Sequence, residues 1–242
     1  RHTRCLSDWS SDVCSSDLEL VTCPTTPEGW AQKEREWRLL WQVYYAFGAL
    51  DGKHVGVKKP PKSGSVFYNY KGFFSILLMA LVDARYRFMW VNVGANGMQS
   101  DAQVFNDSDL KEALDNGTLG LPPAGTLPGQ DGQEPVTYHI LADDAFALKS
   151  YLMKPYSKRN LTRNERLFNY RLSRGRRVVE NAFGILANRF PCLLRTMQQT
   201  PDTVTMIVQA CICLHNLMRT EYPTLQERML DREDDQIGRA HV

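Results

Sequence analysis

The chain has 242 residues, of which 43% are apolar, 23% charged and 10% aromatic, and its formal net charge is +2. This is the composition of an ordinary globular protein, and it excludes collagen, a coiled coil and a wholly disordered chain. No run reaches the roughly 18 apolar residues that cross a bilayer, so we expect no membrane partner.

The two ends of the chain differ in character from the rest. The segments DWSSDVCSSDL at 8–18 and IGRAHV at 237–242 each back-translate to a frame of a common sequencing-library adapter. We therefore interpret both ends as artefact and expect a fragment of a longer protein. This predicts five parts: an artefact at 1–18, a linker and helix at 19–46, a folded domain at 47–219, a polar tail at 220–236 and an artefact at 237–242.

The first half of the chain predicts one helix, three strands and a second helix. Tryptophans near a 3.6-residue period predict a helix at 28–42. An apolar and aromatic run at 43–50 predicts a buried strand that ends at the turn signal Asp51-Gly52. Apolar runs predict two further strands, at 75–82 and 85–93. Ser100 is a good helix cap, so a helix is expected over 101–114.

The second half begins with a segment at 116–135 that is rich in Gly, Pro and Asp, which predicts a long surface insertion. A short apolar strand is expected at 138–142, followed by Asp143-Asp144. The basic segment 149–174 has mixed character, and helices are predicted at 176–190 and 201–219. This order of elements indicates an α/β domain with a mixed sheet flanked by helices and an insertion before the fourth strand.

Three acids stand where such a fold would build a site. Asp51 and Asp143 each follow an apolar strand, and Glu180 lies beside the apolar face of a predicted helix. Gly184 and Ala187 on that helix are small, which would let the helix approach the sheet. Three converging carboxylates repel one another unless a hard divalent cation neutralises them. Alternatively, the aspartates are turn residues and the glutamate is solvated.

The segment 149–195 is strongly basic. It holds twelve Lys and Arg residues against only Glu165 and Glu180, and Tyr151, Tyr156, Phe168 and Tyr170 interleave with the charges. Solvated helical surfaces usually mix both signs, so this excess favours a polyanion partner such as DNA.

Six blocks of sequence resemble, in the same order, the DDE endonuclease domain of PIF/Harbinger transposases and the nucleases derived from them. The resemblance extends over about 24–219 and is carried by ALDGKHV at 49–55, NYKGF at 69–73, GMQSDAQVF at 97–105, ADDAFAL at 142–148 with MKPY at 153–156, RVVENAFG at 177–184 and LHN at 214–216. It implies an RNase H-like fold and a nuclear location.

The resemblance maps the catalytic acids onto Asp51, Asp143 and Glu180, and it adds Asp101 as a fourth ligand of Mg²⁺ or Mn²⁺. Successive strand residues face opposite ways, so only one of Asp143 and Asp144 can point into the site, and we favour Asp143. The implied activity is metal-dependent cleavage of DNA phosphodiesters. A domesticated, catalytically inactive DNA- or chromatin-binding descendant is the alternative.

The expected phosphate contacts come from the basic residues near these acids. They are Lys53, Lys158, Arg159, Arg174, Arg176 and Arg177. Arg176 and Arg177 precede Glu180 by one turn or less, so they can orient that acid instead of touching DNA. His54 is expected to be a strand residue with a local hydrogen bond. Family members carry a DNA-binding region upstream or use a separate DNA-binding partner protein, and oligomerisation remains open.

One metal-like pattern is rejected. Cys211, Cys213 and His215 lie in an apolar helical run, where positions two apart point about 200° away from each other. We expect the two cysteines to be core residues and His215-Asn216 to have a structural hydrogen-bonding role.

Overall fold

The computed structural model describes residues 20–129, 132 and 134–222. Both predicted artefacts and most of the predicted polar tail lie outside these residues. Within the described part of the chain, no helix combines the length and the apolarity of a membrane span.

The centre of the fold is a five-stranded mixed sheet with the order β3-β2-β1-β4-β5. β1, β2 and β3 are antiparallel neighbours, whereas β4 and β5 run parallel to β1. The mixed sheet flanked by helices is therefore confirmed. The strands are β1 (Ala46–Gly56), β2 (Ser75–Val82), β3 (Phe88–Asn96), β4 (His139–Leu141) and β5 (Leu152–Met153).

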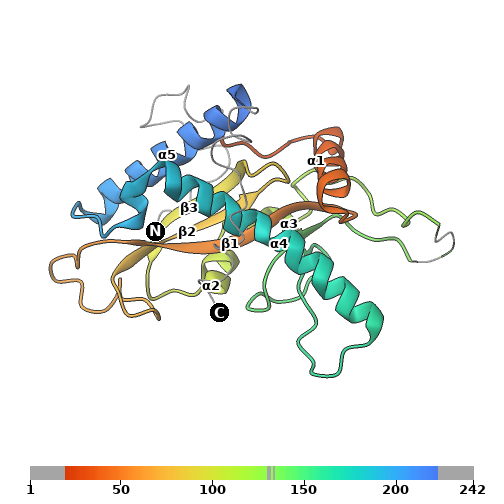
Figure 1. The fold of residues 1–242 in the computed structure, drawn as a ribbon, viewed down its shortest axis with the longest axis horizontal. Coiled ribbons are helices and arrows are strands. Elements are labelled where there is room, and N and C mark those ends of the chain that lie inside the picture. The colour runs from red at the N-terminus through yellow and green to blue at the C-terminus, as the bar shows by residue number, and fades with distance from the viewer. Residues whose placement is uncertain (1–19, 130–131, 133, 223–242) are drawn as a thin grey trace.

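Helices cover both faces of this sheet, and α4 and α5 cross one face together (Figure 1). The opposite face packs against α2 and α3. Every residue of β2 is buried, because its side chains pack alternately into the two hydrophobic layers. Leu78 and Ala80 face α4 and α5, while Leu77 and Met79 face α2 and α3. The helices are α1 (Pro27–Trp41), α2 (Asp101–Asn106), α3 (Asp109–Asp115), α4 (Arg163–Arg189) and α5 (Pro201–Glu221), with a 3₁₀ turn η2 (Pro191–Leu194).

Side-chain caps fix where several helices begin. The hydroxyl of Thr200 accepts a hydrogen bond from the Thr203 amide, which starts α5 where the sequence predicts. α4 begins at Arg163 instead of residue 176, because Thr162 and Glu165 form a reciprocal capping box at its start. The N-terminal half of α4 consequently projects beyond the sheet (Figure 1).

Two further predicted boundaries were wrong. β1 does not turn at Asp51-Gly52 but continues to Gly56, because both residues pair with β2 opposite Ala80 and Met79. The helix predicted over 101–114 is two helices, because the Ser108 hydroxyl caps a new helix by accepting from the Lys111 amide. The segment 116–135 contains no helix or strand where it is described, as predicted for an insertion.

Candidate active site

The site is built around Asp51, which lies in the middle of the central strand. Asp51 pairs with Ala80, so its side chain points to the face that α4 covers, and it is only 17% exposed. Burial raises the pKa of this carboxyl to about 7; the Gly52 amide and Arg176 oppose the shift, and the charges of Asp101 and Glu180 reinforce it. An ionised Asp51 is therefore costly in the folded protein unless further positive charge reaches it.

Asp101 reaches the same strand from the other face of the sheet. It is the first residue of α2, placed there by the Ser100 capping box with Gln103. Its carboxylate lies against the backbone of Gly52, where a β-carbon would be 2.3 Å from Oδ1. Burial, and then the charge of Asp143, raise the pKa of Asp101, whereas Lys71 lowers it. Gly52 thus provides the space that brings Asp101 against β1, at the residue next to Asp51.

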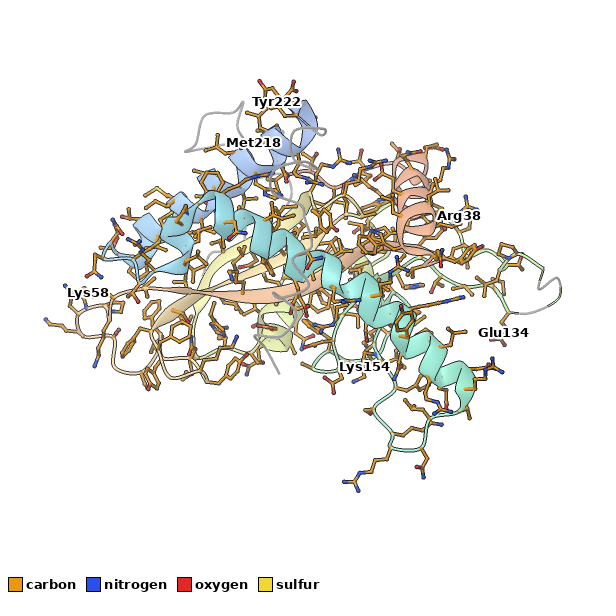
Figure 2. The ribbon with its side chains drawn as sticks, in the orientation of Figure 1. Arg38, Lys58, Glu134, Lys154, Met218 and Tyr222 are labelled. Carbon is orange, nitrogen blue, oxygen red and sulfur yellow. The ribbon has the colours of Figure 1, made fainter. Side chains whose placement is uncertain are left out.

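The structure separates the two candidate aspartates after β4. Asp143 is half-buried; its Oδ1 accepts a hydrogen bond from the Ala145 amide at 3.0 Å, and its charge acts on Asp101. Asp144 is exposed, and its backbone oxygen accepts a hydrogen bond from the Lys154 ammonium at 2.9 Å. Lys154 is labelled in Figure 2. This arrangement favours Asp143 as the member of the site.

Glu180 joins the group through an arginine on its own helix. The Arg176 guanidinium lies 2.8 Å from Glu180 Oε1 and 4.0 Å from Asp51 Oδ2. Arg176 therefore bridges the two acids and acts as an orienting residue for them. Arg177 is exposed, at the neighbouring position of α4.

The close approach of α4 to the sheet occurs at Gly175, and the expectation that Gly184 provides it was wrong. A β-carbon at Gly175 would lie 2.6 Å from Leu141 Cδ1, whereas one at Gly184 would meet nothing within 4 Å. The reason is helical phase: Gly175 lies on the buried side of α4 with Leu172, Val178 and Val179.

Asp51, Asp101, Asp143 and Glu180 are hereafter the acidic cluster. The four acids are linked electrostatically. The charges of Glu180 and Asp101 raise the pKa of Asp51, and the charge of Asp143 raises the pKa of Asp101. Carboxylate oxygens are the donors that Mg²⁺ and Mn²⁺ prefer, so the chemistry of the set fits a hard divalent cation. Within residues 20–129, 132 and 134–222, no three His, Cys, Asp or Glu side chains are grouped closely enough to hold a metal ion.

The predicted phosphate contacts fall into different surroundings. Lys53 is half-buried, and burial and Lys71 lower its pKa while Asp51 raises it. Lys158 forms an ion pair with Glu165 at 2.6 Å, and the Arg174 guanidinium lies 5.9 Å from the centre of the Trp41 ring.

Arg159 is exposed, like Arg177. These two arginines are the exposed predicted contacts that the ion pair with Glu165 does not involve, whereas Lys158 is exposed but paired and Lys53 is half-buried.

Sequence reasoning did not select Lys71, although its charge acts on Asp101, Lys53 and His54. The signal was present in the segment NYKG, because an asparagine and a glycine around a lysine indicate a tight turn that presents a cation.

The residues of the rejected metal pattern are structural where described. His215 is fully buried, and its Nε2 lies 2.8 Å from the Tyr86 carbonyl oxygen. The Asn216 amide group accepts from the Phe88 amide and donates to the Phe88 carbonyl, which fixes α5 to β3. Cys211 of α5 is buried in the hydrophobic core as expected, whereas Cys213 is half-buried, so the expectation of two core cysteines is confirmed only for Cys211.

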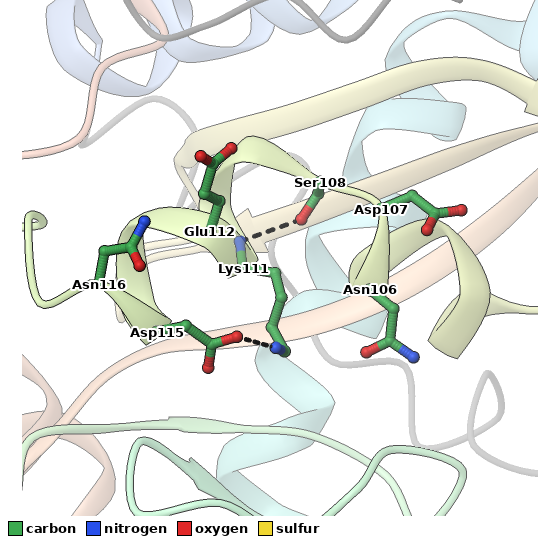
Figure 3. Close-up of a pocket in the computed structure, with 7 residues that line it drawn as sticks. All are labelled: Asn106, Asp107, Ser108, Lys111, Glu112, Asp115 and Asn116. Carbon is green, nitrogen blue, oxygen red and sulfur yellow. Dashed lines mark hydrogen bonds and ion pairs between the residues drawn. The ribbon is translucent and has the colours of Figure 1, made fainter.

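A separate polar pocket of about 410 Å³ lies at the junction of α2 and α3 (Figure 3). The Lys111 ammonium forms an ion pair with Asp115 across it. It contains none of the predicted site residues. Its lining residues are Asn106, Asp107, Ser108, Lys111, Glu112, Asp115 and Asn116.

Residues 50–216 match the family described as DDE superfamily endonuclease, and the chain belongs to this family. Together with the mixed sheet, the match confirms the RNase H-like expectation and the resemblance to Harbinger-type nucleases.

The chain is similar to the proteins named "Putative nuclease HARBI1" of Homo sapiens and of Xenopus laevis. Each is 24% identical over 218 residues, which cover 89% of this chain and 58% of the relative. It is also 27% identical over 193 residues to "Protein ALP1-like" of Arabidopsis thaliana, which covers 78% of this chain and 47% of that protein. The chain thus spans about half the length of these relatives. No solved structure matches it.

Proposed function

We propose that this chain is a divalent-metal-dependent DNA endonuclease of transposase origin. The observation that carries the proposal is Asp51, a carboxylate 17% exposed in the central strand that also experiences the charges of Asp101 and Glu180. The folded protein would be more stable with an apolar residue at this position, because buried like charges destabilise a fold. Groups kept at such a cost are typical of catalytic sites.

The acidic cluster is the proposed holder of Mg²⁺ or Mn²⁺. When bound, such an ion supplies charge neutralisation and an activated water or hydroxyl for attack at phosphorus. Asp51 and Glu180 are the proposed ligands on the α4 face, while Asp101 and Asp143 are the proposed ligands from α2 and from the segment after β4. Arg176 holds Asp51 and Glu180 in a fixed relation.

DNA is the proposed partner, supported by the basic excess over 149–195. The half-buried Lys53 and the exposed Arg159 and Arg177 are the proposed phosphate contacts. Binding should be weak, nonspecific and sensitive to salt, because it depends on backbone phosphates. A separate DNA-binding protein would then supply site recognition, and a nuclear location accords with such a role.

The test is a plasmid-nicking assay with Mg²⁺ or Mn²⁺, run beside Asp51→Asn, Glu180→Gln and a chelator control. We expect wild type to nick and both variants to lose nicking by at least about 100-fold. Equal nicking by wild type and variants would assign the activity to a contaminant and overturn the proposal.

An inactive DNA-binding descendant is the second candidate, and one observation favours it. Arg176 offsets part of the negative charge of Asp51 and Glu180, so these two acids depend less on a bound cation than an unpaired set would. Wild-type protein that binds DNA but never nicks it with either ion would establish this candidate.

A further inference from the structure

We propose that the loop between β1 and β2, residues 57–74, is a stacking platform on which Tyr70 receives an unpaired base of the DNA strand held at the acidic cluster. This inference rests on the proposed DNA substrate and adds its form: a strand that is locally single-stranded beside the phosphate to be cleaved.

The first observation is an aromatic ring held out into solvent. Tyr70 is 83% exposed, more than any other large hydrophobic or aromatic side chain among the residues described. Its ring centre lies 5.6 Å from that of His54 in an edge-to-face arrangement, and the Lys71 ammonium lies 5.4 Å from the ring centre. Base stacking requires an open aromatic face of this kind, and a neighbouring cation contributes to it.

The turn that presents Tyr70 is fixed in place by the hydrogen bonds of a buried asparagine. Asn69 is 3% exposed; its Oδ1 accepts from the Lys71 amide at 3.0 Å and from the Phe73 amide at 3.3 Å. Its Nδ2 donates to Ser75 Oγ at 2.8 Å, and this hydroxyl also lies 2.9 Å from His54 Nδ1. A platform fixed before binding loses little conformational entropy when a base stacks on it.

The platform adjoins the acidic cluster through β1. His54 and Gly52 are two residues apart, so they share one face of the strand and are separated by about 7 Å. Gly52 carries the Asp101 carboxylate against it, and His54 contacts Tyr70. The platform and the Asp101 side of the acidic cluster therefore lie on neighbouring positions of one strand face, so a short stretch of one DNA strand can reach both.

The charge around the platform favours a nucleic acid over another protein. Between Asp51 and Asp83 the chain holds five lysines and no acidic residue. Lys58 is exposed where β1 leaves the sheet (Figure 2), and Lys59 lies 5.4 Å from the centre of the Phe74 ring. Cations interleaved with aromatic rings are typical of surfaces that bind single strands.

The test compares Tyr70→Ala with Tyr70→Phe, which keeps the ring, and with Tyr222→Ala, which removes another exposed tyrosine at the end of α5. Fluorescence anisotropy with the 242-residue protein measures affinity for a single-stranded oligonucleotide and for the same sequence as a full duplex. An oligonucleotide that contains 2-aminopurine reports stacking directly by its quenching.

We expect Tyr70→Ala to bind the single strand about 5- to 100-fold more weakly, to bind the duplex as wild type does and to lose quenching, while both controls behave as wild type. Unchanged single-strand affinity would overturn the proposal. An equal loss for both DNA forms would also overturn it, because Tyr70 would then merely position Lys71.

A nicking assay separates this inference from the proposed activity. Wild type that never nicks, together with a selective loss of single-strand binding in Tyr70→Ala, keeps the platform and rejects the endonuclease. Wild type that nicks, together with a Tyr70→Ala variant that binds the single strand normally, keeps the endonuclease and rejects the platform.

Discussion

The carboxylate of Asp101 lies directly against Gly52, so that a β-carbon on Gly52 would be 2.3 Å from Oδ1 and 2.7 Å from Oδ2. The glycine is needed for this close approach and not for an unusual backbone, because Gly52 pairs regularly with Met79 inside β1. Gly52, which the sequence predicts to be a turn residue, therefore lies within a strand and makes room for an acid of the site.

Gly52→Ala tests this contact. The added methyl group must displace Asp101, and we expect at least a tenfold loss of nicking with a modest loss of stability, of about 1–3 kcal/mol. Gly56→Ala is the matched control on the same strand, because a β-carbon there meets Thr196 at an ordinary 3.5 Å. Nicking by Gly52→Ala at the rate of Gly56→Ala would show that the position of Asp101 does not matter.

Gly175→Ala tests how closely α4 must approach the sheet. Its β-carbon would overlap Leu141, so we expect the free energy of unfolding to fall by about 1–3 kcal/mol in urea denaturation. Gly184→Ala on the same helix meets nothing, and it should be neutral or stabilising by up to about 1 kcal/mol. Equal effects of the two variants would contradict the packing described.

Asp51→Asn should stabilise the metal-free protein at pH 8 and have little effect at pH 4. The folded-state pKa of Asp51 is raised to about 7, so the folded state binds more protons than the unfolded state from about pH 4 to pH 7, and its stability falls as the pH rises through that window. The asparagine removes that penalty, which we expect to be worth about 1–3 kcal/mol at pH 8.

Melting temperatures in the presence of a chelator measure this effect. A rise of several °C is expected at pH 8. The exposed Asp144 supplies the control, since Asp144→Asn should change the melting temperature at neither pH. A destabilised Asp51→Asn protein at pH 8 would mean that the ionised carboxylate contributes favourable contacts.

Arg176 and Arg177 should differ in what they do, although they are adjacent. Arg176 contacts Asp51 and Glu180, so Arg176→Gln should reduce nicking at least tenfold and change DNA affinity little. Arg177 is exposed, so Arg177→Gln should weaken DNA binding and lower the slope of log affinity against log salt by about 1. Affinity and nicking measured over a salt series distinguish the two, and identical behaviour would refute the assignment of separate roles.

Local sequence was sufficient for parts of this structure. The bounds of β2 agree with the prediction, because a continuous apolar run of this length is typical of a strand that is covered on both faces. The start of α5 agrees because Thr200 and Pro201 mark a helix start unambiguously. The residues Asp51, Asp143 and Glu180 could be selected as candidates from their positions beside apolar segments.

Tertiary contacts decided the rest. β5 has two residues and exists through its pairing with β4, which no local pattern shows. The long α4 was signalled by Thr162 and Glu165, but the dense positive charge after them obscured the helical pattern. The choice of Gly175 over Gly184 depends on which side of α4 meets Leu141, which only the assembled sheet defines.

The acidic cluster draws its members from both sides of β1, since Asp51 and Glu180 belong to the α4 layer while Asp101 comes from α2 across the sheet. The proposed endonuclease activity would thus require that both hydrophobic layers be complete at the same time. A nascent or partly denatured chain, with one layer formed and the other open, would carry the same acids without bringing them together. The proposed DNA cleavage would then be restricted to fully folded protein.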